Sequence, residues 1–156
     1  MLSLPLALAL SAAQPLPKAE ALPPPDFTDK EIIAVIDAMF ATLEAGDGPA
    51  LLKLVYPEGR VTGSGNFASG FTGRRSSSFT EYAARMNPGA GFVERITNPM
   101  IDQDGDVALV WAPFTITRAG KVVACGFDHF DMVRETGAWK VMNLTFSSRT
   151  TGCPGQ

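Results

Sequence analysis

Three ionisable residues, Asp128, His129 and Asp131, stand close together in the stretch GFDHFDMV, where most of their neighbours are apolar. A carboxyl group in apolar surroundings either finds a partner or keeps its proton to a higher pH, and such an acid can transfer protons. His129 is the only histidine of the chain, so a site with several histidine ligands is excluded. Paired with Asp131 or Asn143, it can act as a general acid or base. We therefore treat Asp128, His129 and Asp131 as candidate catalytic residues.

Each of these residues also has a structural interpretation. Asp128 can be a buried aspartate that hydrogen-bonds to the backbone or to an arginine such as Arg85 or Arg95. His129 can be a strand histidine whose nitrogens are satisfied locally. The sequence contains no G-x-S-x-G, H-E-x-x-H or C-x-x-C motif, which argues against the common hydrolase, zinc protease and thioredoxin mechanisms. Proton transfer without a cofactor is one hypothesis for these residues, and a structural role is the other.

Charge and spacing limit the possible partners. The formal net charge is -3 and the sequence has no basic stripe, so neither a nucleic acid nor an anionic membrane surface is expected as a partner. The stretch DQDGD, residues 102–106, resembles the start of a calcium loop, but Val107 and Pro113 stand where that loop needs glycine and glutamate. We therefore expect a hairpin turn there, no metal site and no cofactor.

Three helices are predicted ahead of the strand-rich part of the chain. The stretch TDKE, residues 28–31, has the form of a capping box at the start of a long helix that ends near Gly46. A short second helix is expected with Pro49 in its first turn, and a second capping box, SFTE at 78–81, starts a third helix that carries Tyr82. The apolar residues of the long helix recur at helical spacing and form one stripe: Ile32, Val35, Ile36, Met39, Phe40 and Leu43.

The remaining segments favour strands. The glycine-rich segment 59–73 predicts one strand followed by a flexible loop. Strand-forming runs separated by short turns come after it: 92–101, 107–117, 121–134 and 139–148. Strands joined by such short links must be antiparallel. Helices followed by an antiparallel meander indicate a single α+β domain.

The last hairpin decides which side chains share a face. With a three-residue loop at 135–137, Val133 lies opposite Trp139, whereas a two-residue turn at 136–137 would shift this register. In the first register one face carries Ala124, Gly126, Asp128, Phe130, Met132, Met142, Leu144 and Phe146, and the other carries Cys125, Phe127, His129, Asp131, Val133, Trp139, Val141, Asn143 and Thr145. Both faces are largely apolar. We therefore expect one face to meet the helices and the other to be covered by a second subunit or a ligand.

Residues 1–25 are interpreted as a signal peptide and a Pro-rich linker, followed by one domain over residues 26–156. An apolar run at 2–13 has the length of a signal-peptide core, and small residues permit cleavage near Gln14 or Leu22. A Pro-rich tail without signal function is the alternative. Export to the periplasm or the medium would permit a disulfide between Cys125 and Cys153, although a buried thiol and a loose tail thiol explain the two cysteines as well.

The pattern G-x-D-x-F-x-x-V-R-x-x-G-x-W-K, residues 126–140, and the order of the elements resemble the nuclear transport factor two-like superfamily, including its SnoaL-like and lumazine-binding branches. The resemblance covers residues 28–153. It implies a cystatin-like cone, in which a curved antiparallel sheet wraps around the long first helix, with a pocket at the open end and a homodimer formed through the sheet. Enzymes of this superfamily, such as ketosteroid isomerase, work with acids, tyrosines or histidines and without a metal, while many relatives only bind ligands or support assembly.

These observations lead to two main functional hypotheses. The first is an exported domain that binds a small apolar or aromatic molecule. The second is a cofactor-free isomerase, lyase or cyclase in which Asp128, or His129 with Asp131, moves a proton. An exported interaction module without a ligand is a third reading, and no membrane contact is expected once the signal peptide is removed. The side chains expected to bind the ligand are Phe40, Tyr56, Tyr82, Trp111, Phe130 and Asn143.

Overall fold

The computed structural model describes residues 28–89 and 91–156 of the 156-residue chain. The expected signal peptide and linker, residues 1–25, and the expected cleavage positions lie outside the described residues. The described part contains three helices and a seven-stranded sheet. None of these helices has the length and hydropathy needed to cross a membrane.

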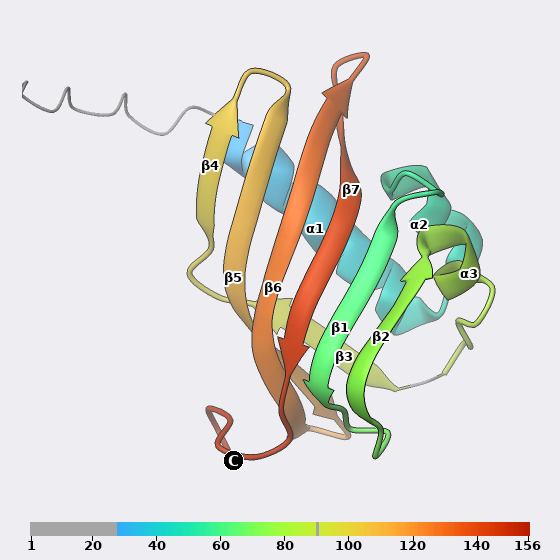
Figure 1. The fold of residues 1–156 in the computed structure, drawn as a ribbon, viewed down its shortest axis with the longest axis vertical. Helices are drawn as coiled ribbons and strands as arrows, with labels where there is room; N and C mark the ends of the chain where they lie inside the picture. Colours follow the sequence, from blue (N-terminus) through green and yellow to red (C-terminus); the bar gives the residue numbers. More distant parts are fainter. Residues whose placement is uncertain (1–27, 90) are drawn as a thin grey trace, which may run out of the picture.

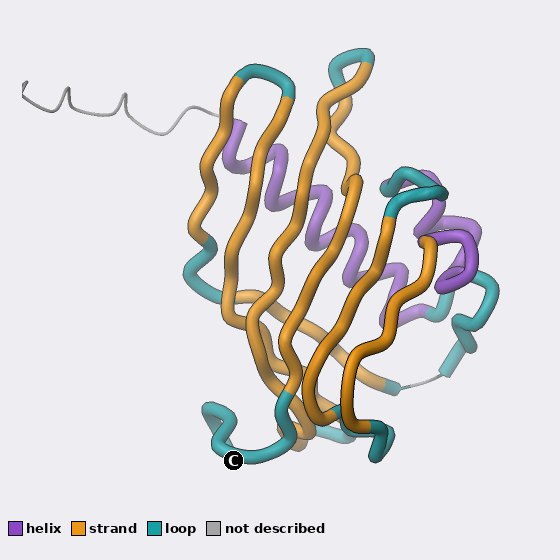
Figure 2. Tube along the Cα trace, viewed as in Figure 1, coloured by secondary structure: helices purple, strands orange, loops and turns teal. Residues whose placement is uncertain are grey.

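One curved sheet wraps around the long first helix, and the two short helices lie together at one side of it (Figures 1 and 2). The helices are α1 (Thr28–Ala45), α2 (Gly48–Leu54) and α3 (Phe79–Ala83). The strands are β1 (Arg60–Asn66), β2 (Thr72–Ser78), β3 (Phe92–Ile96), β4 (Met100–Asp104), β5 (Val107–Arg118), β6 (Lys121–Glu135) and β7 (Ala138–Ser148). The predicted α+β class, with a curved sheet around one long helix and two short helices, is confirmed.

Helix α1 supplies the centre of the core. Its predicted apolar stripe is buried except for Val35, which is half-buried. The stripe packs on apolar side chains of the inner sheet face: Ala108, Val110, Phe130, Met132, Val141 and Leu144. The cap expected at 28–31 involves a side chain that lies outside the described residues. Burial of this helix face against the sheet stabilises the position of α1.

Local hydrogen bonds fix the starts of the two short helices. The backbone N–H of Ala50 donates to Oδ1 of Asp47 at 2.9 Å, which caps α2. The capping box predicted at α3 is confirmed: the N–H of Ser78 donates to the Glu81 carboxylate at 2.8 Å, and the N–H of Glu81 donates to the Ser78 hydroxyl at 3.1 Å. This box sets the direction in which α3 presents Tyr82.

The sheet is mixed rather than antiparallel throughout. Its strands follow the order β2-β1-β7-β6-β5-β3, and β4 pairs with β5 as well. Strands β1 and β7 are parallel, with Val61 opposite Leu144, whereas the other pairs are antiparallel. The antiparallel expectation rested on short links and holds for the strands that such links join. No short link connects β1 to β7, so nothing local constrains their relative direction.

Two predicted strand segments differ in the structure. Segment 59–73 was expected to be a strand and a flexible loop, but β1 pairs with β2 along its whole length and only residues 67–71 form the connection. Segment 92–101 was expected to be one strand, but it splits into β3 and β4 around Asn98, which has a φ of 44°. The split follows from pairing, since β4 and β3 bind successive halves of β5.

The last hairpin has a two-residue turn instead of the preferred three-residue loop. Both residues of the turn, 136–137, have positive φ values, as this hairpin type requires. Trp139 therefore lies opposite Arg134 rather than Val133. A bulge next to Asp131 then shifts the register by one residue. The predicted faces are consequently wrong near the turn, where Trp139 is buried in the core, and correct beyond the bulge.

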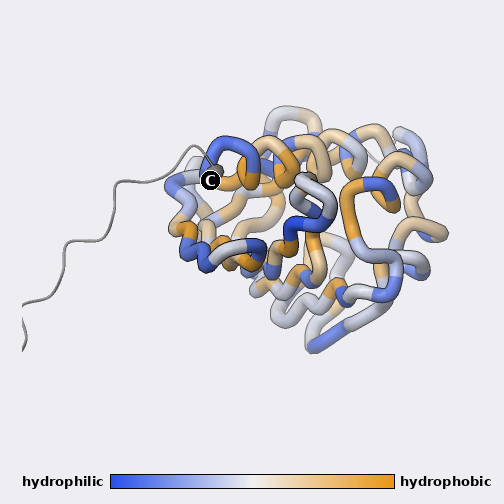
Figure 3. The backbone as a smooth tube through the Cα atoms, turned by 90° about the horizontal axis from the view of Figure 1, so that it is seen from above, coloured by the Kyte–Doolittle hydropathy of each residue, from blue (hydrophilic) through white to orange (hydrophobic). Residues whose placement is uncertain are grey.

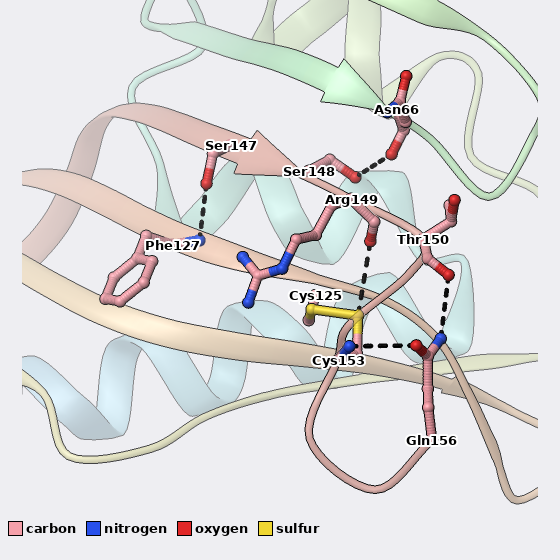
Figure 4. Close-up of a disulfide and its surroundings, with 9 residues drawn as sticks. All are labelled: Asn66, Cys125, Phe127, Ser147, Ser148, Arg149, Thr150, Cys153 and Gln156. Carbon is pink, nitrogen blue, oxygen red and sulfur yellow. Dashed lines mark hydrogen bonds between the residues drawn. A yellow bond between two sulfur atoms is a disulfide. The ribbon is translucent and has the colours of Figure 1, made fainter.

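A disulfide joins Cys125 of β6 to Cys153 in the carboxyl-terminal segment, with the two Cα atoms 5.7 Å apart (Figure 4). The backbone of Cys125 also exchanges two hydrogen bonds of 2.9 Å with Arg149. The chain therefore stays beside β6 after β7 ends. Of the two hypotheses for the cysteines, the structure confirms the disulfide.

The sheet has an apolar side chain layer on each face. Seen from above, hydrophobic and hydrophilic stretches are interspersed along the chain (Figure 3). In β5 the inward side chains Ala108, Val110 and Ala112 are buried, and the outward side chains Val107, Leu109 and Trp111 are exposed. The inner layer packs on α1, while the described residues leave the outer layer open.

Candidate functional site

A two-lobed cavity lies between the second half of α1, the β1–β2 hairpin, α3 and β3. One lobe has a volume of about 310 Å³ and includes Arg75 and Arg85, and we call it the basic lobe. The other has a volume of about 190 Å³ and includes Glu94 and Asp128, and we call it the acid lobe. The two lobes adjoin, since both are lined by Leu43, Val61, Arg75, Tyr82, Phe92 and Phe146.

Asp128 is the most unusual group of the acid lobe. It lies on β6 opposite Phe146 of β7, and only 1% of its surface is exposed. Neither of its carboxyl oxygens has a hydrogen-bond partner among the described residues. Burial raises the pKa of Asp128 well above its ordinary value, and the nearby charge of Glu94 raises it further. Asp128 therefore keeps its proton to a higher pH than an ordinary aspartate does.

Glu94 is the second acid of this lobe. It lies on β3 opposite Ile116 of β5, and its side chain is half-buried at the cavity wall. Burial raises the pKa of Glu94 to about 7. Because the two carboxyl groups interact, they titrate as a pair, and the pair holds at least one proton at neutral pH. One group can thus accept a proton while the other donates one.

Tyr82 and Arg75 stand at the junction of the two lobes. Burial raises the pKa of Tyr82 to about 12, and the charge of Glu94 adds to this effect. The phenol therefore remains a hydrogen-bond donor throughout the physiological range. The guanidinium of Arg75 lies over the ring of Phe67, 4.0 Å from its centroid, which holds a positive charge beside the cavity.

Aromatic rings form much of the cavity wall. The ring of Phe146 packs edge-on against Phe67 and Phe114, with centroids 5.9 and 6.2 Å apart. Gly63 of β1 makes this arrangement possible, because a Cβ atom there would lie 2.5 Å from the Phe146 ring. The cavity is thus lined mainly by apolar side chains and contains a small number of polar groups, as ligand-binding pockets do.

The chemistry available in the acid lobe is acid–base chemistry. Two carboxyl groups and one phenol converge there, and each can donate a proton or a hydrogen bond. Within residues 28–89 and 91–156, no group of three or more His, Cys, Asp or Glu side chains is arranged to hold a metal ion. The arrangement suits a ligand that carries a carbonyl or hydroxyl oxygen on an apolar body.

The structure brings only two of the predicted site residues to the cavity, Asp128 and Tyr82. Phe40 and Phe130 pack edge-to-face in the core, with centroids 6.1 Å apart, and line neither lobe. Tyr56 also lines neither lobe and lies near Lys140, whose ammonium is 5.7 Å from its ring centroid.

The other predicted site residues lie on the outer face of the sheet. Nε2 of His129 is 3.6 Å from Oδ1 of Asp131, and the amide of Asn143 donates to Oδ2 of Asp131 at 3.1 Å. Trp111 stands beside His129, with ring centroids 6.1 Å apart. The predicted pairing of His129 with its neighbours is present, but the structure separates this group from Asp128 by the thickness of the sheet, and none of its members lines either lobe.

Sequence reasoning missed Glu94 and Arg75. Glu94 lies between the apolar residues Phe92 and Ile96 on one face of β3, and an acid on an apolar strand face is the same signal that singled out Asp128. Arg75 had no comparable signal, because its segment was expected to be a loop. Its place in the cavity follows from the pairing of β2 with β1, in which Arg75 lies opposite Gly63.

Comparisons with known proteins agree on the type of domain. A family model described as a SnoaL-like domain matches residues 28–145. No curated protein matches the chain. The solved structures that resemble it include a protein of unknown function with a cystatin-like fold from Nostoc punctiforme, with 16% identity and a TM-score of 0.65, over 83% of this chain and 96% of the other.

Two further solved structures give the same result. A nuclear transport factor two-like protein with a cystatin-like fold from Novosphingobium aromaticivorans has 16% identity and a TM-score of 0.62, over 81% of this chain and 84% of the other. A Mycobacterium tuberculosis protein of unknown function has 19% identity and a TM-score of 0.62, over 78% of this chain and 72% of the other. At such low sequence identities, the structural similarity is evidence for the fold alone.

Proposed function

Since the chain belongs to the SnoaL-like domain family of the nuclear transport factor two-like superfamily, we propose that it binds a small apolar molecule in the two-lobed cavity and moves a proton on it without a cofactor. One observation carries this proposal. Asp128 is almost fully buried, has no hydrogen-bond partner among the described residues and stands beside a second carboxyl group. A buried acid without a partner is costly to the fold. Such a cost is common at sites that act on a ligand.

The roles of the acids follow from their environments. The raised pKa of Asp128 favours its protonated form, which can donate a hydrogen bond to a carbonyl oxygen of the ligand. Tyr82 can donate a second hydrogen bond to the same oxygen. Glu94, with a pKa of about 7, can remove a proton from the carbon next to that carbonyl. Ketosteroid isomerase likewise keeps one aspartic acid neutral in an apolar site in order to stabilise an enolate.

The test uses 2-tetralone, an apolar ketone with exchangeable protons beside its carbonyl. Proton NMR in D₂O measures how fast these protons are replaced by deuterium. The wild-type chain should accelerate the exchange, and the rate should rise with pH through the titration of Glu94 near pH 7, because only the ionised carboxylate is a base. Glu94→Gln should slow the exchange by about 100-fold, the usual contribution of a general base.

Matched variants on one strand separate the site from the rest of the sheet. Asp128→Asn should slow the exchange, whereas Asp131→Asn, on the outer face of β6, should not. Binding of 2-tetralone without accelerated exchange would leave a ligand-binding domain without catalysis, the other functional hypothesis. Absence of both binding and exchange would contradict the proposed function for this class of ligand.

We also propose that two chains associate through the outer face of the sheet. Its exposed apolar side chains include Leu109 and Trp111, each 40% exposed. The ring of Trp111 stacks on Phe127, with centroids 5.3 Å apart, which gives this face a flat aromatic centre. An apolar patch of this kind on a folded domain is typical of a protein–protein contact.

Export of the chain to the periplasm or the medium is a further proposal. The disulfide between Cys125 and Cys153 supports it, because disulfides persist mainly in oxidising compartments. Expression of the full sequence, followed by intact mass measurement of the periplasmic fraction, tests the proposal. A product that retains all residues and remains in the cytoplasm would contradict it.

A further inference from the structure

The two lobes of the cavity differ in charge. The acid lobe contains Glu94 and Asp128 together with Arg118, and Arg75 lines both lobes. The basic lobe contains Arg75 and Arg85 and no aspartate or glutamate among the residues that line it. Ser77 and Asn87 add uncharged polar groups to the wall of the basic lobe. The two lobes therefore differ in that acidic side chains line only the acid lobe.

The two arginines of the basic lobe have no ion-pair partner among the described residues. The arginine ion pairs of the described part are Arg95 with Glu44 and Arg134 with Asp106. Arg75 instead places the face of its guanidinium on the ring of Phe67, which leaves the N–H groups at its edge available.

Glu81 is the acid nearest to Arg85 in sequence, one helical turn before it. Its carboxylate is already occupied as the acceptor in the capping box of α3. The charge of Arg85 contributes only a minor part of the lowering of the Glu81 pKa, which the hydrogen bond from the Ser78 backbone dominates. Arg85 is thus free to bind an anion at the cavity.

A ligand long enough to occupy both lobes would pass between Phe92 and Phe146, which line both. In the acid lobe its anionic end would meet the carboxyl group of Glu94, whereas the basic lobe has no acidic side chain in its wall. A cationic end would meet the two arginines in the other lobe. The charge pattern therefore selects a molecule with one anionic end and one uncharged polar end.

We propose that the ligand of this cavity is an apolar, flat molecule that carries a carboxylate, which Arg75 and Arg85 bind in the basic lobe while a carbonyl or hydroxyl group at its other end reaches Asp128. The position of the reacting end rests on the proposed function, whereas the carboxylate site rests on the two arginines. Guanidinium groups bind carboxylates through paired hydrogen bonds, which makes this recognition specific as well as favourable.

The experiment compares two probes of the same size, 6-hydroxy-2-naphthoic acid and its uncharged amide. Both carry the same hydroxyl group and the same aromatic body, so their affinity ratio isolates the carboxylate. Fluorescence titration should give at least about tenfold tighter binding of the acid at low salt. The ratio should decrease as salt is added, since the arginines are exposed to solvent.

Variants then assign the effect to the two arginines. Arg75→Gln and Arg85→Gln should each lower the affinity ratio by about fivefold, and the double variant should bring it close to one. Arg75→Lys should retain part of the ratio because it keeps the charge. Arg74→Gln is the matched control, since Arg74 neighbours Arg75 on β2 but lines neither lobe.

The outcomes distinguish the carboxylate site from the proposed proton transfer. Equal binding of acid and amide would overturn the carboxylate site and leave proton transfer on 2-tetralone unaffected. A preference for the acid that survives in the double variant would also overturn it, because the anion would then bind elsewhere. Loss of the preference in the double variant, with exchange on 2-tetralone absent in the wild type, would support the carboxylate site and count against the catalytic role alone.

Discussion

Two carboxyl groups in one apolar lobe cannot both ionise at low cost, because each negative charge loses its hydration and repels the other. In this chain the two carboxyl groups are those of Asp128 and Glu94, and both have raised pKa values. Asp128 is the more deeply buried of the two and retains its proton more strongly. Glu94 faces the cavity and titrates nearer to neutral pH. The difference in burial therefore assigns the donor and acceptor roles.

The same residues make stability depend on pH. In the folded state the pKa of Asp128 is raised, so its contribution to stability is complete below the unfolded pKa near 4 and is lost as the pH rises through the folded pKa. The wild-type free energy of unfolding should therefore fall as the pH rises above 4. Asp128→Asn removes this titrating group and should reduce that fall. Urea unfolding at several pH values measures this.

Asp131 provides the control for this prediction. It accepts a hydrogen bond from Asn143 on the outer face and is half-buried. Asp131→Asn should keep the pH profile of the wild type. Parallel profiles for Asp128→Asn and the wild type would show instead that Asp128 is solvated or paired in solution.

At the residue scale the sequence could indicate Asp128 but not its partner. An acid among Phe130, Leu144 and Phe146 is visible from strand alternation alone. Glu94 carries the same alternation signal, yet its nearness to Asp128 depends on how far the sheet curves. Curvature is a property of the whole sheet and has no signature in the short segment around either acid.

At the scale of elements, helices and hairpin links were predictable because their signals are local. Both short helices start where the sequence places capping or turn residues. Strand β2, with the sequence TGRRSSS, is a strand because β1 pairs with it and not because of its own propensity. The register of the last hairpin was missed near the turn, because the bulge next to Asp131 compensates for the shorter turn.

The disulfide gives a prediction at this same scale. Cys125 and Cys153 are 28 positions apart, and a cross-link over a segment of that length stabilises a fold by about 3–4 kcal/mol in the chain-entropy model. The double variant Cys125→Ala with Cys153→Ala should therefore unfold at a lower denaturant concentration, as circular dichroism can measure.

A reducing agent supplies the control for the disulfide. It should lower the stability of the wild type to a similar extent and leave the double variant unchanged. Equal unfolding midpoints for the wild type and the double variant would contradict a stabilising role of the disulfide.

At the scale of the whole molecule, one sheet separates the two surfaces to which functions are proposed. Its concave face packs on α1 and leaves the two-lobed cavity at one end. Its convex face carries four of the residues that sequence reasoning placed in the site: Trp111, His129, Asp131 and Asn143. Strand alternation alone predicts two apolar faces but does not say which one holds the ligand. The side on which α1 packs decides this.

The convex face provides the final prediction. If two chains associate there, Trp111 lies in a desolvated contact, and Trp111→Glu would bury a charge without a partner. The dissociation constant of the dimer should rise by at least about 100-fold, or about 2.7 kcal/mol, which sedimentation equilibrium measures. Phe71 is also an exposed aromatic residue, at 45%, but it lies at the tip of the β1–β2 hairpin, so Phe71→Glu should leave association unchanged. A monomeric wild type, or equal association of both variants, would show that the convex face does not join two chains.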